Sequence, residues 1–573
     1  AAAWIQLLTC QESAAELERS LDILATDLRD VPERHQSLRA VFESSWNLLS
    51  AHDQETLARL SIFLNPFRRE AAAAVVSGSQ NGSAEMLLRL SSLVDKSLLR
   101  RVGSQAQEAR FGMHEIIKQS AAQKRDARPD EAALVRARHS RYYAAWLERI
   151  GLELRGPRQL QALEQIEVEL DDIRAAWSHI LEQLDYPALL NALIAMVQYF
   201  DLRNRQQDAQ QLFGASLAAL ERVSLPPGAP PAEMATLKAY LLAFYGLALF
   251  AQGEFDPALA AYQQALALTG RLAEPHRQRI HVLLFFGMWL LPGLEIDQLY
   301  RDCRAYFERS GDRWFLAMAM MQYGNYTQYL AIDLALTRRL YQDSLDIFQQ
   351  LGDRYGMIHA LDNLAGLCAM NGENETSRSY SLESLELSRA LGDPWRVATA
   401  LLNLGMAHVA LGEYAPARAA YLESLELVRG LGNRRIVARY LASLGYVYYL
   451  EGEYPRASYL FTEALELSRQ IDDRREMGMC EMNLGNIAHA SGDLLVARSH
   501  YLQSIEILEA LPFVRWELSI SLKRMGRLGF ALGELDQARA YYRQALEISL
   551  ELKRMPEILE NLVGIAELQA GRG

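Results

Sequence analysis

The stretch LLNLGMAHVALGEYAPARAAYLESLELVRG, residues 401–430, decides the fold of this chain because its pattern recurs every 40 residues. Segments that share the pattern start at Gly352, Gly392, Gly432, Asp472 and Pro512. In the quoted stretch, Leu404 and Gly405 are followed seven residues later by Gly412, and three other segments repeat this arrangement. A fixed period of this length indicates a solenoid, in which each repeat is one unit that packs on its neighbours.

Each repeat predicts two packed helices, an A helix followed by a B helix. A glycine such as Gly412 can take the left-handed conformation that ends the A helix, and the acidic residue after it suits the start of the B helix. The B helix carries a small residue, an aromatic residue four positions later in all but one case, and a further small residue, as at Ala417, Tyr421 and Ser424. This spacing places all three on one helical face, where they pack against the A helix.

The N-terminal third carries a different pattern. Leu38–Leu49 and Gln54–Phe63 have the helical period, and Leu87–Leu93 predicts a further short helix. Two short strands, Ser97–Arg101 and Arg110–Met113, are predicted to form a wing around a polar loop. This order of elements is typical of a winged helix.

Both parts resemble known families. The repeats resemble the tetratricopeptide repeat, with the longer period of the kinesin light chain branch. The N-terminal third resembles the winged-helix module of bacterial STAND ATPases of the NB-ARC type, and 171–177 resembles the helix that joins that module to the repeats. The winged-helix resemblance rests on the stretches Arg34–Ala40, Leu60–Phe63, Leu93–Leu99 and Met113–Glu115. We therefore expect a mainly α chain, with a winged-helix domain followed by an α-α superhelical tetratricopeptide solenoid.

The expected domain organisation follows from these patterns and the resemblance. The chain begins with Ala1 and without an initiator Met, which suggests a piece of a longer polypeptide. We expect the tail of an upstream nucleotide-binding or helical domain at 1–30, the winged-helix domain at 31–125, a helical linker region at 126–222, degenerate tetratricopeptide-like repeats at 223–310, repeats with a period of about 40 residues at 311–555, and a closing helix at 556–573.

Charge and composition restrict the partners. The formal net charge is −12, and residues 1–120 carry 13 Lys and Arg against 15 Asp and Glu, so we expect no direct nucleic-acid binding. The apolar run Leu283–Leu291 is about half the length of a membrane-spanning helix, so we expect no membrane contact. The four cysteines form no CxxC pair, which favours reduced thiols and a cytoplasmic location.

A nucleotide contact is implied at His114. In the resembled family a Met-His-Asp motif ends the winged helix, and its His contacts the β-phosphate of bound ADP; here the motif is Met113-His114-Glu115. The resemblance implies that His114 contacts ADP in the full-length protein, where ADP and ATP are the expected cofactors. The alternative is that the His114 side chain is hydrogen-bonded by neighbouring backbone.

None of the six lysines follows a glycine, so the chain lacks a Walker A loop. The chain is therefore predicted not to be an enzyme, with no catalytic or metal-binding residues.

A polar row on the A helices is the predicted ligand site. Relatives place Asn before the Leu of the Leu-Gly pair, where its amide faces a concave groove and holds an extended peptide. The predicted groove residues are Gln322, Asn363, Asn403, Tyr446, Tyr449, Asn483, Asn486 and Arg527; Ser443 and Arg524 occupy the Asn position in two repeats, and His489 lies nearby. Of these, Asn363, Asn403 and Asn483 are expected to face solvent. The alternative is that these asparagines belong to the repeat pattern and bond a neighbouring helix.

Together these features predict a ligand-sensing region of a STAND signalling ATPase. An unknown protein, peptide or small molecule would bind the solenoid, and the upstream nucleotide-binding domain would respond by nucleotide-dependent activation and oligomerisation. The alternative function is a constitutive scaffold for protein partners without a nucleotide switch.

Overall fold

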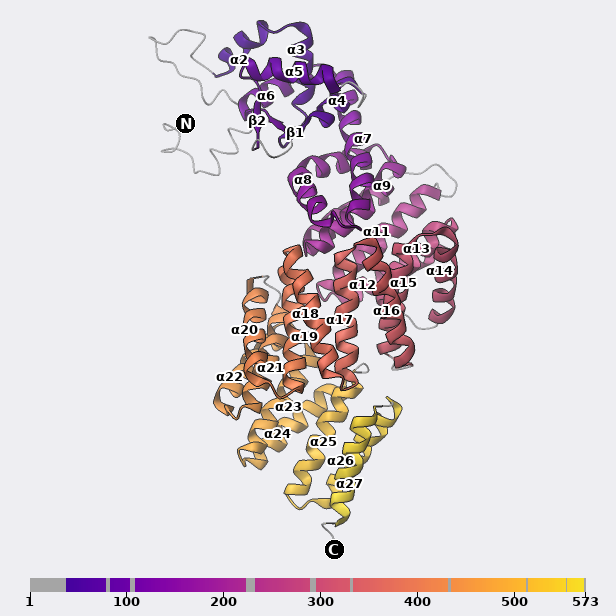
Figure 1. Ribbon diagram of the computed structural model, residues 1–573, viewed down its shortest axis with the longest axis vertical. Coiled ribbons are helices and arrows are strands. Elements are labelled where there is room, and N and C mark those ends of the chain that lie inside the picture. Colours follow the sequence, from indigo (N-terminus) through magenta and orange to yellow (C-terminus); the bar gives the residue numbers. More distant parts are fainter. Residues whose placement is uncertain are drawn as a thin grey trace, which may run out of the picture. The chain divides into compact units, whose positions relative to one another are not determined.

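The computed structural model describes residues 38–78, 83–103, 109–222, 232–288, 295–329, 333–430, 434–511, 514–552 and 554–570. Across these ranges the chain forms 26 helices and three short strands, which confirms the predicted mainly α fold (Figure 1). The segment predicted as the tail of an upstream domain, 1–30, lies outside the described residues.

The winged helix comprises the first helices and all three described strands. In chain order these are α2 (Leu38–Asn47), α3 (Ala51–Leu60), β1 (Phe67–Arg68), α4 (Arg69–Ser77), α5 (Ser83–Asp95), β2 (Arg100–Val102), β3 (Arg110–Gly112) and α6 (Glu115–Asp126). The strands form an antiparallel sheet in the order β1-β3-β2, with Phe111 opposite both Phe67 and Arg101. The two wing strands were predicted. The strand β1 and the alanine-rich helix α4 were not, because β1 has two residues and α4 begins without a side-chain cap.

Five longer helices complete the first compact unit. They are α7 (Pro129–Glu153), α8 (Gln159–Glu182), α9 (Tyr186–Leu202), α10 (Gln206–Glu221) and α11 (Ala232–Ala251). Helix α7 packs on α4 and α8, and α11 packs on α10. The first unit therefore extends to Gly253, apart from 155–157 and 202–204, which group with the second unit. The division at 253 falls inside the region 223–310 that we predicted as degenerate repeats.

Helix α11 is long and apolar enough to cross a membrane by length and composition, with a mean hydropathy of 1.5 over its best window. However, 72% of that window is buried inside the protein, and Leu237 and Leu241 are fully enclosed. A core helix of a folded domain has these properties.

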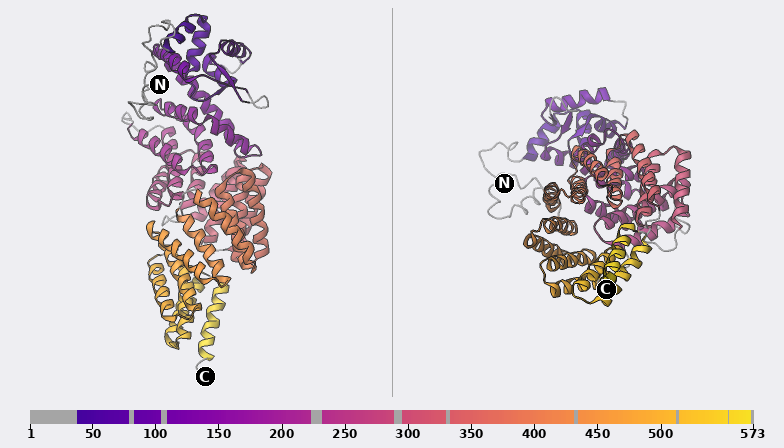
Figure 2. Two further views of the ribbon diagram at one scale, coloured as in Figure 1. Left: turned by 90° about the vertical axis from the view of Figure 1, so that its left-hand side faces the viewer. Right: turned by 60° about the horizontal axis from the view of Figure 1, so that its bottom comes forward.

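The second unit consists of helices in succession (Figures 1 and 2). Its first helices are α12 (Phe255–Thr269), α13 (Glu274–Met288), α14 (Ile296–Ser310), α15 (Arg313–Tyr329) and α16 (Leu334–Leu351). Five helix pairs follow at the predicted period: α17 (Arg354–Met370) with α18 (Asn374–Leu391), α19 (Pro394–Ala410) with α20 (Tyr414–Gly430), α21 (Arg434–Leu450) with α22 (Tyr454–Gln470), α23 (Arg474–Ala490) with α24 (Leu494–Glu509), and α25 (Arg515–Ala531) with α26 (Leu535–Glu551). The last described helix is α27 (Met555–Ala570).

Close packing between the A and B helices of one repeat explains the recurring residue pattern. Tyr421 on α20 is 3% exposed, and a Cβ atom added to Gly405 on α19 would lie 2.3 Å from its ring. Ala417 and Ser424, on the same face of α20, are completely buried. Gly412 has a φ of 77°, which favours glycine and ends α19 as predicted.

Ion pairs between consecutive repeats form two columns, which we call the inter-repeat ladder. The first column joins an arginine early in a B helix to a glutamate near the start of the following B helix: Arg338–Glu373, Arg378–Glu413, Arg418–Glu451 and Arg498–Glu534. The second column joins Arg389 to Glu423 and Arg429 to Glu463. Each exposed pair contributes at most about 1 kcal/mol. The ladder therefore contributes little to the free energy of unfolding, and its main effect is on how successive repeats align.

Candidate functional site

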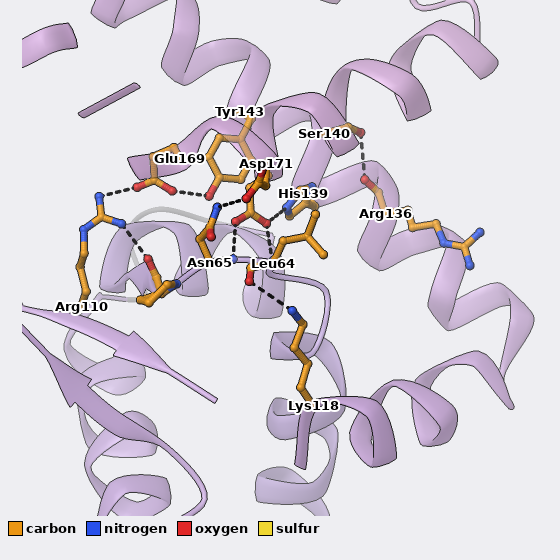
Figure 3. Close-up of polar contacts among 12 residues, drawn as sticks. Leu64, Asn65, Arg110, Lys118, Arg136, His139, Ser140, Tyr143, Glu169 and Asp171 are labelled. Carbon is orange, nitrogen blue, oxygen red and sulfur yellow. Dashed lines mark hydrogen bonds and ion pairs between the residues drawn. The ribbon is translucent and has the colours of Figure 1, made fainter. Parts of the chain in front are cut away.

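A buried carboxylate connects the winged helix to helix α8. Asp172 is completely buried and accepts hydrogen bonds from the backbone N–H groups of Leu64 and Asn65, at 2.8 and 2.9 Å. Its Oδ1 also lies 3.1 Å from Nε2 of His139 on α7, which is 3% exposed. Figure 3 shows these contacts around the loop that follows α3. One side chain thus holds the loop, α7 and α8 together.

A second buried carboxylate, Glu169, lies one helical turn before Asp172. It accepts hydrogen bonds from Arg110 on β3 at 2.7 Å and from the hydroxyl of Tyr143 on α7 at 2.8 Å. Arg68 on β1 lies 3.4 Å from the same carboxylate. Burial, together with the charges of Asp172 and Glu169, raises the pKa of Tyr143 well above its ordinary value, so this tyrosine stays a neutral donor. We call Asp172, Glu169, His139, Tyr143 and Arg110 the junction network.

A wide, open depression lies beside the junction network. It has a volume of about 490 Å³ and is lined by Leu64, Lys118, Asp171, Arg174, Ala175 and Ser178. Lys118 donates to the carbonyl oxygen of Leu64 at 3.2 Å, and Arg174 pairs with Asp208 at 3.3 Å. The charged side chains that line the depression are thus bonded to neighbouring groups of the protein. The depression is therefore not assigned a binding or catalytic role.

His114 precedes helix α6 and is exposed. Its Nδ1 accepts a long hydrogen bond, 3.4 Å, from the backbone N–H of Ile116, so the imidazole caps its own helix. This is the backbone contact that the alternative interpretation predicts. Its Nε2 atom forms no hydrogen bond with the described residues. Among these residues, no cluster of His, Cys, Asp or Glu side chains could hold a metal ion.

The first part of the predicted polar row is hydrogen-bonded within itself. Asn363 on α17 donates to Asn325 on α15 at 3.0 Å, and Asn325 donates to Gln322 at 3.2 Å. The hydroxyl of Tyr341, on the B helix α16, donates to Asn325 at 2.8 Å. Gln322 is 7% exposed, whereas Asn363 is half-buried. These amides join adjacent A helices, and the side-chain oxygen of Asn363 accepts no hydrogen bond from a described residue.

Asn403 lies beside an acidic residue that we did not predict. Asp362, just before Asn363, accepts hydrogen bonds from the Ser384 hydroxyl at 2.7 Å and from the Asn403 amide. The other oxygen of Asp362, Oδ2, is buried and has no hydrogen-bond partner in the described structure. Burial raises the pKa of Asp362 to about 6, although both hydrogen bonds and Arg396 favour its charged form.

Asn483 and Asn486 lie on α23 and are less accessible than expected. Asn483 is 8% exposed and Asn486 is 5% exposed. Asn486 donates to Asn483 at 3.2 Å and accepts from the hydroxyl of Tyr501, on the B helix α24, at 2.9 Å. The expectation that Asn483 faces solvent is therefore wrong, because its side chain is buried and bonds Asn486, which in turn bonds a tyrosine of the B helix. The Nδ2 group of Asn483 donates to no described residue.

The remaining predicted groove residues are more open. Tyr446 on α21 is 37% exposed and stacks on Tyr449, with ring centroids 6.1 Å apart. Arg527 on α25 is exposed, and Arg524 one turn earlier is half-buried. His489 contacts Tyr501, with ring centroids 6.5 Å apart. The structure therefore brings Tyr446, Tyr449, Asn483, Asn486 and Arg527 onto the A helices of three consecutive repeats, α21, α23 and α25.

The junction network was not predicted from the sequence, although one signal of it was present. The buried face of α8 includes Leu163, Ile166, Ile173 and Trp177. Glu169 lies three residues after Ile166, and Asp172 lies four before Ala176, so both carboxylates fall on that apolar face. Acidic residues at core positions need hydrogen-bond partners, which marks them as positions of interest.

Two family models match the chain. Residues 49–124 match the winged helix-turn-helix domain, and residues 356–573 match the MalT-like TPR region. The first match covers α3 to α6 of the winged helix, and the second covers the five helix pairs and α27. Both agree with the elements that the structure shows.

Three curated relatives, from Mycobacterium bovis and two strains of Mycobacterium tuberculosis, are described by name as HTH-type transcriptional regulators. Each is 31% identical to this chain over 199 residues, which is 34% of this chain. The match spans only 22% of the length of these relatives.

Two solved structures are similar in part. A Rap protein complexed with competence and sporulation factor has a TM-score of 0.45 and 16% identity over 72% of this chain and 99% of that chain. The STAND protein PH0952 from Pyrococcus horikoshii, with a tetratricopeptide repeat sensor, has a TM-score of 0.36 and 15% identity over 98% of this chain and 72% of that chain. By its two family matches, this chain joins a winged helix-turn-helix domain to a MalT-like tetratricopeptide region, the domain pair that its resemblance to the C-terminal part of STAND regulators predicted.

Proposed function

We propose that this chain is the ligand-sensing region of a cytoplasmic signal-transducing ATPase. In this proposal the A-helix face of the tetratricopeptide region binds a peptide, protein or small molecule. An upstream nucleotide-binding domain carries the Walker A loop that this sequence lacks, and the chain itself does not hydrolyse ATP. Ligand binding shifts the parent protein from a resting ADP state toward an active, oligomer-forming ATP state, to the extent that the ligand prefers the active state.

The junction network is the observation that carries this proposal. A sensor can act on a nucleotide switch only if the winged helix moves together with the helices that follow it. Asp172 and Glu169 fasten the loop after α3 and strand β3 to α7 and α8 through buried, charge-assisted hydrogen bonds. A fully satisfied buried network of this kind is rigid. A displacement of α8 would therefore reach the winged helix as a rigid movement.

A constitutive scaffold is the alternative function, and it needs neither bound nucleotide nor a rigid junction. The hydrogen-bonded amides of Asn363 and Asn486 support it, because they join helices as structural asparagines would. The two functions differ in one measurable property. A sensor's parent protein holds ADP at rest, whereas a scaffold holds no nucleotide.

The test is the nucleotide content of the purified full-length parent protein, with wild type compared to His114→Ala and to His52→Ala. His52 is an exposed histidine on α3 and is the matched control. We expect bound ADP in the wild type and in the control. Loss of a charged contact to phosphate costs about 1.5–3 kcal/mol, so ADP should dissociate roughly ten- to a hundredfold more readily from His114→Ala. A wild-type parent without nucleotide would favour the scaffold.

A further inference from the structure

Two arginines on α25 lack the carboxylate partners that other arginines of the second unit have. In the inter-repeat ladder, Arg378 and Arg418 each face a glutamate of the next repeat. Arg524 and Arg527 make no ion pair with any described residue, and the Nε atom of Arg524 is buried without a hydrogen-bond partner. A buried donor without an acceptor is costly unless something supplies one.

Both arginines occupy positions of the predicted ligand row. Arg524 stands where other repeats have Asn403 or Asn483, and Arg527 stands where they have Tyr446 or Asn486. The A helices α21, α23 and α25 contact one another in succession. Equivalent positions on neighbouring A helices therefore lie side by side, which places both guanidinium groups next to the amides of α23.

The groups around the two arginines are mostly neutral, with one carboxylate nearby. Burial and the charge of Glu567 raise the pKa of Tyr542, whereas Arg527 and Arg524 lower it. Burial lowers the pKa of His489, and the positive charges of Arg527 and Arg524 lower it further. Burial raises the pKa of Tyr446, against the opposing charge of Arg524. No carboxylate contributes to the pKa shift of His489 or to that of Tyr446. The cluster thus has two fixed positive charges, a histidine held neutral and tyrosines held neutral.

An aromatic surface adjoins this positive cluster. The stacked pair Tyr446 and Tyr449 lies on α21, and the ring of Tyr446 is partly open to solvent. On the α23 side, Tyr501 packs against His489 and bonds to Asn486. Guanidinium groups bind carboxylates and phosphates with two parallel hydrogen bonds, and tyrosine rings supply contact area at low entropic cost.

We propose that Arg524 and Arg527 form an anion subsite on the A-helix face, which binds a carboxylate or phosphate group of a ligand whose adjoining part packs on Tyr446 and Tyr449. The bound anion supplies a hydrogen-bond acceptor to the guanidinium group of Arg524, whose Nε atom has no partner among the described residues. The proposal rests on the proposed function, since it assigns a chemical class to the ligand of the same face. The anion subsite restricts the ligand of the A-helix face to molecules that carry a carboxylate or phosphate group.

The experiment is calorimetric titration of residues 1–573 with citrate and, separately, with inorganic pyrophosphate at low salt. The variants are Arg524→Gln, Arg527→Gln and the double variant. Arg543→Gln is the matched control, because Arg543 is an exposed arginine on the B helix of the same repeat. We expect saturable binding of at least one anion to the wild type. Each groove variant should bind about tenfold or more weakly, and the control should bind as the wild type does.

The comparison of the two anions distinguishes a carboxylate ligand from a phosphate ligand. Circular dichroism melts confirm folding, which neither substitution should disturb because neither arginine has an ion partner to lose. Absence of binding to the wild type, or equal binding by wild type and double variant, would overturn the anion subsite. The ADP content of the parent protein is measured independently, so failure of the subsite and failure of the proposed function remain distinguishable.

Discussion

At the residue scale, two acidic side chains, the buried Asp172 and the half-buried Asp362, behave in opposite ways. Asp172 accepts hydrogen bonds from two backbone N–H groups and lies within hydrogen-bond distance of His139. Asp362 has a buried oxygen without a partner. A carboxylate that accepts several hydrogen bonds stabilises the fold in its charged form, whereas a desolvated one stabilises it in the neutral form. The two residues therefore give different predictions.

Asp172→Asn should weaken the junction network. An amide can accept the hydrogen bond of one backbone N–H group, but its own NH₂ then faces the other donor, which loses its acceptor. We expect a loss of about 2 kcal/mol or more. Faster hydrogen exchange at the amides of Leu64 and Asn65 would report it. Asp171→Asn is the control, because Asp171 is exposed and bonds only the Asn65 side chain; its effect should stay within about half a kcal/mol.

Asp362→Asn should change how stability depends on pH. Because burial raises the pKa of Asp362 from its ordinary value of 3.8 to about 6, the folded chain binds more protons than the unfolded chain between these pH values. The contribution of Asp362 to the free energy of unfolding therefore falls as pH rises from about 4 to about 6, by at most about 3 kcal/mol. Urea unfolding of the variant should lack this dependence and exceed the wild type near pH 7. Parallel pH profiles would contradict the prediction.

At the scale of elements, two glycines within A helices, Gly405 on α19 and Gly366 on α17, differ in crowding. A Cβ atom on Gly405 would lie 2.3 Å from the ring of Tyr421, whereas Gly366, within α17, has nothing within 4 Å. Crowding rather than backbone conformation therefore requires glycine at Gly405, and neither requirement holds at Gly366.

Alanine substitution at these two glycines should have opposite effects. Gly405→Ala should destabilise the second unit by about 1–3 kcal/mol, because the tyrosine ring must move out of a well-packed site. Gly366→Ala should stabilise it by up to about 1 kcal/mol, because alanine favours the helix and meets no neighbour. Thermal melts followed by circular dichroism would measure both. A loss of stability at Gly366 would show that crowding is not the deciding difference.

The elements differ in how far sequence could predict them. The 40-residue spacing predicted the helix pairs α17 to α26, because the glycines and aromatic residues that define each repeat also make its contacts. It placed Asn363, Asn403 and Asn483 on A helices. It could not show that Tyr501 reaches Asn486, because an exposed amide and a hydrogen-bonded amide leave the same sequence pattern. The junction network joins residues more than 100 positions apart, such as Leu64 and Asp172, which no periodicity reveals.

At the scale of the whole molecule, the chain consists of two compact units that are stabilised by different kinds of contact. The first depends on long-range polar contacts through Asp172 and Glu169. The second depends on contacts between successive helices, so its stability is approximately a sum over repeats and their interfaces. Substitutions in the junction network should therefore act on the first unit as a whole, whereas substitutions in one repeat should act mainly on that repeat and its neighbours.

The inter-repeat ladder also determines how the gene can change in length. Removal of residues 392–431 would delete Glu413 together with Arg418, and Glu423 together with Arg429, so no charge would lose its counterpart. Arg378 would then meet Glu451, and Arg389 would meet Glu463, in the register that their deleted equivalents had. Recombination between neighbouring repeats can therefore shorten or lengthen the solenoid in steps of 40 codons. A chain with this deletion should fold, with a single cooperative melt of lower enthalpy.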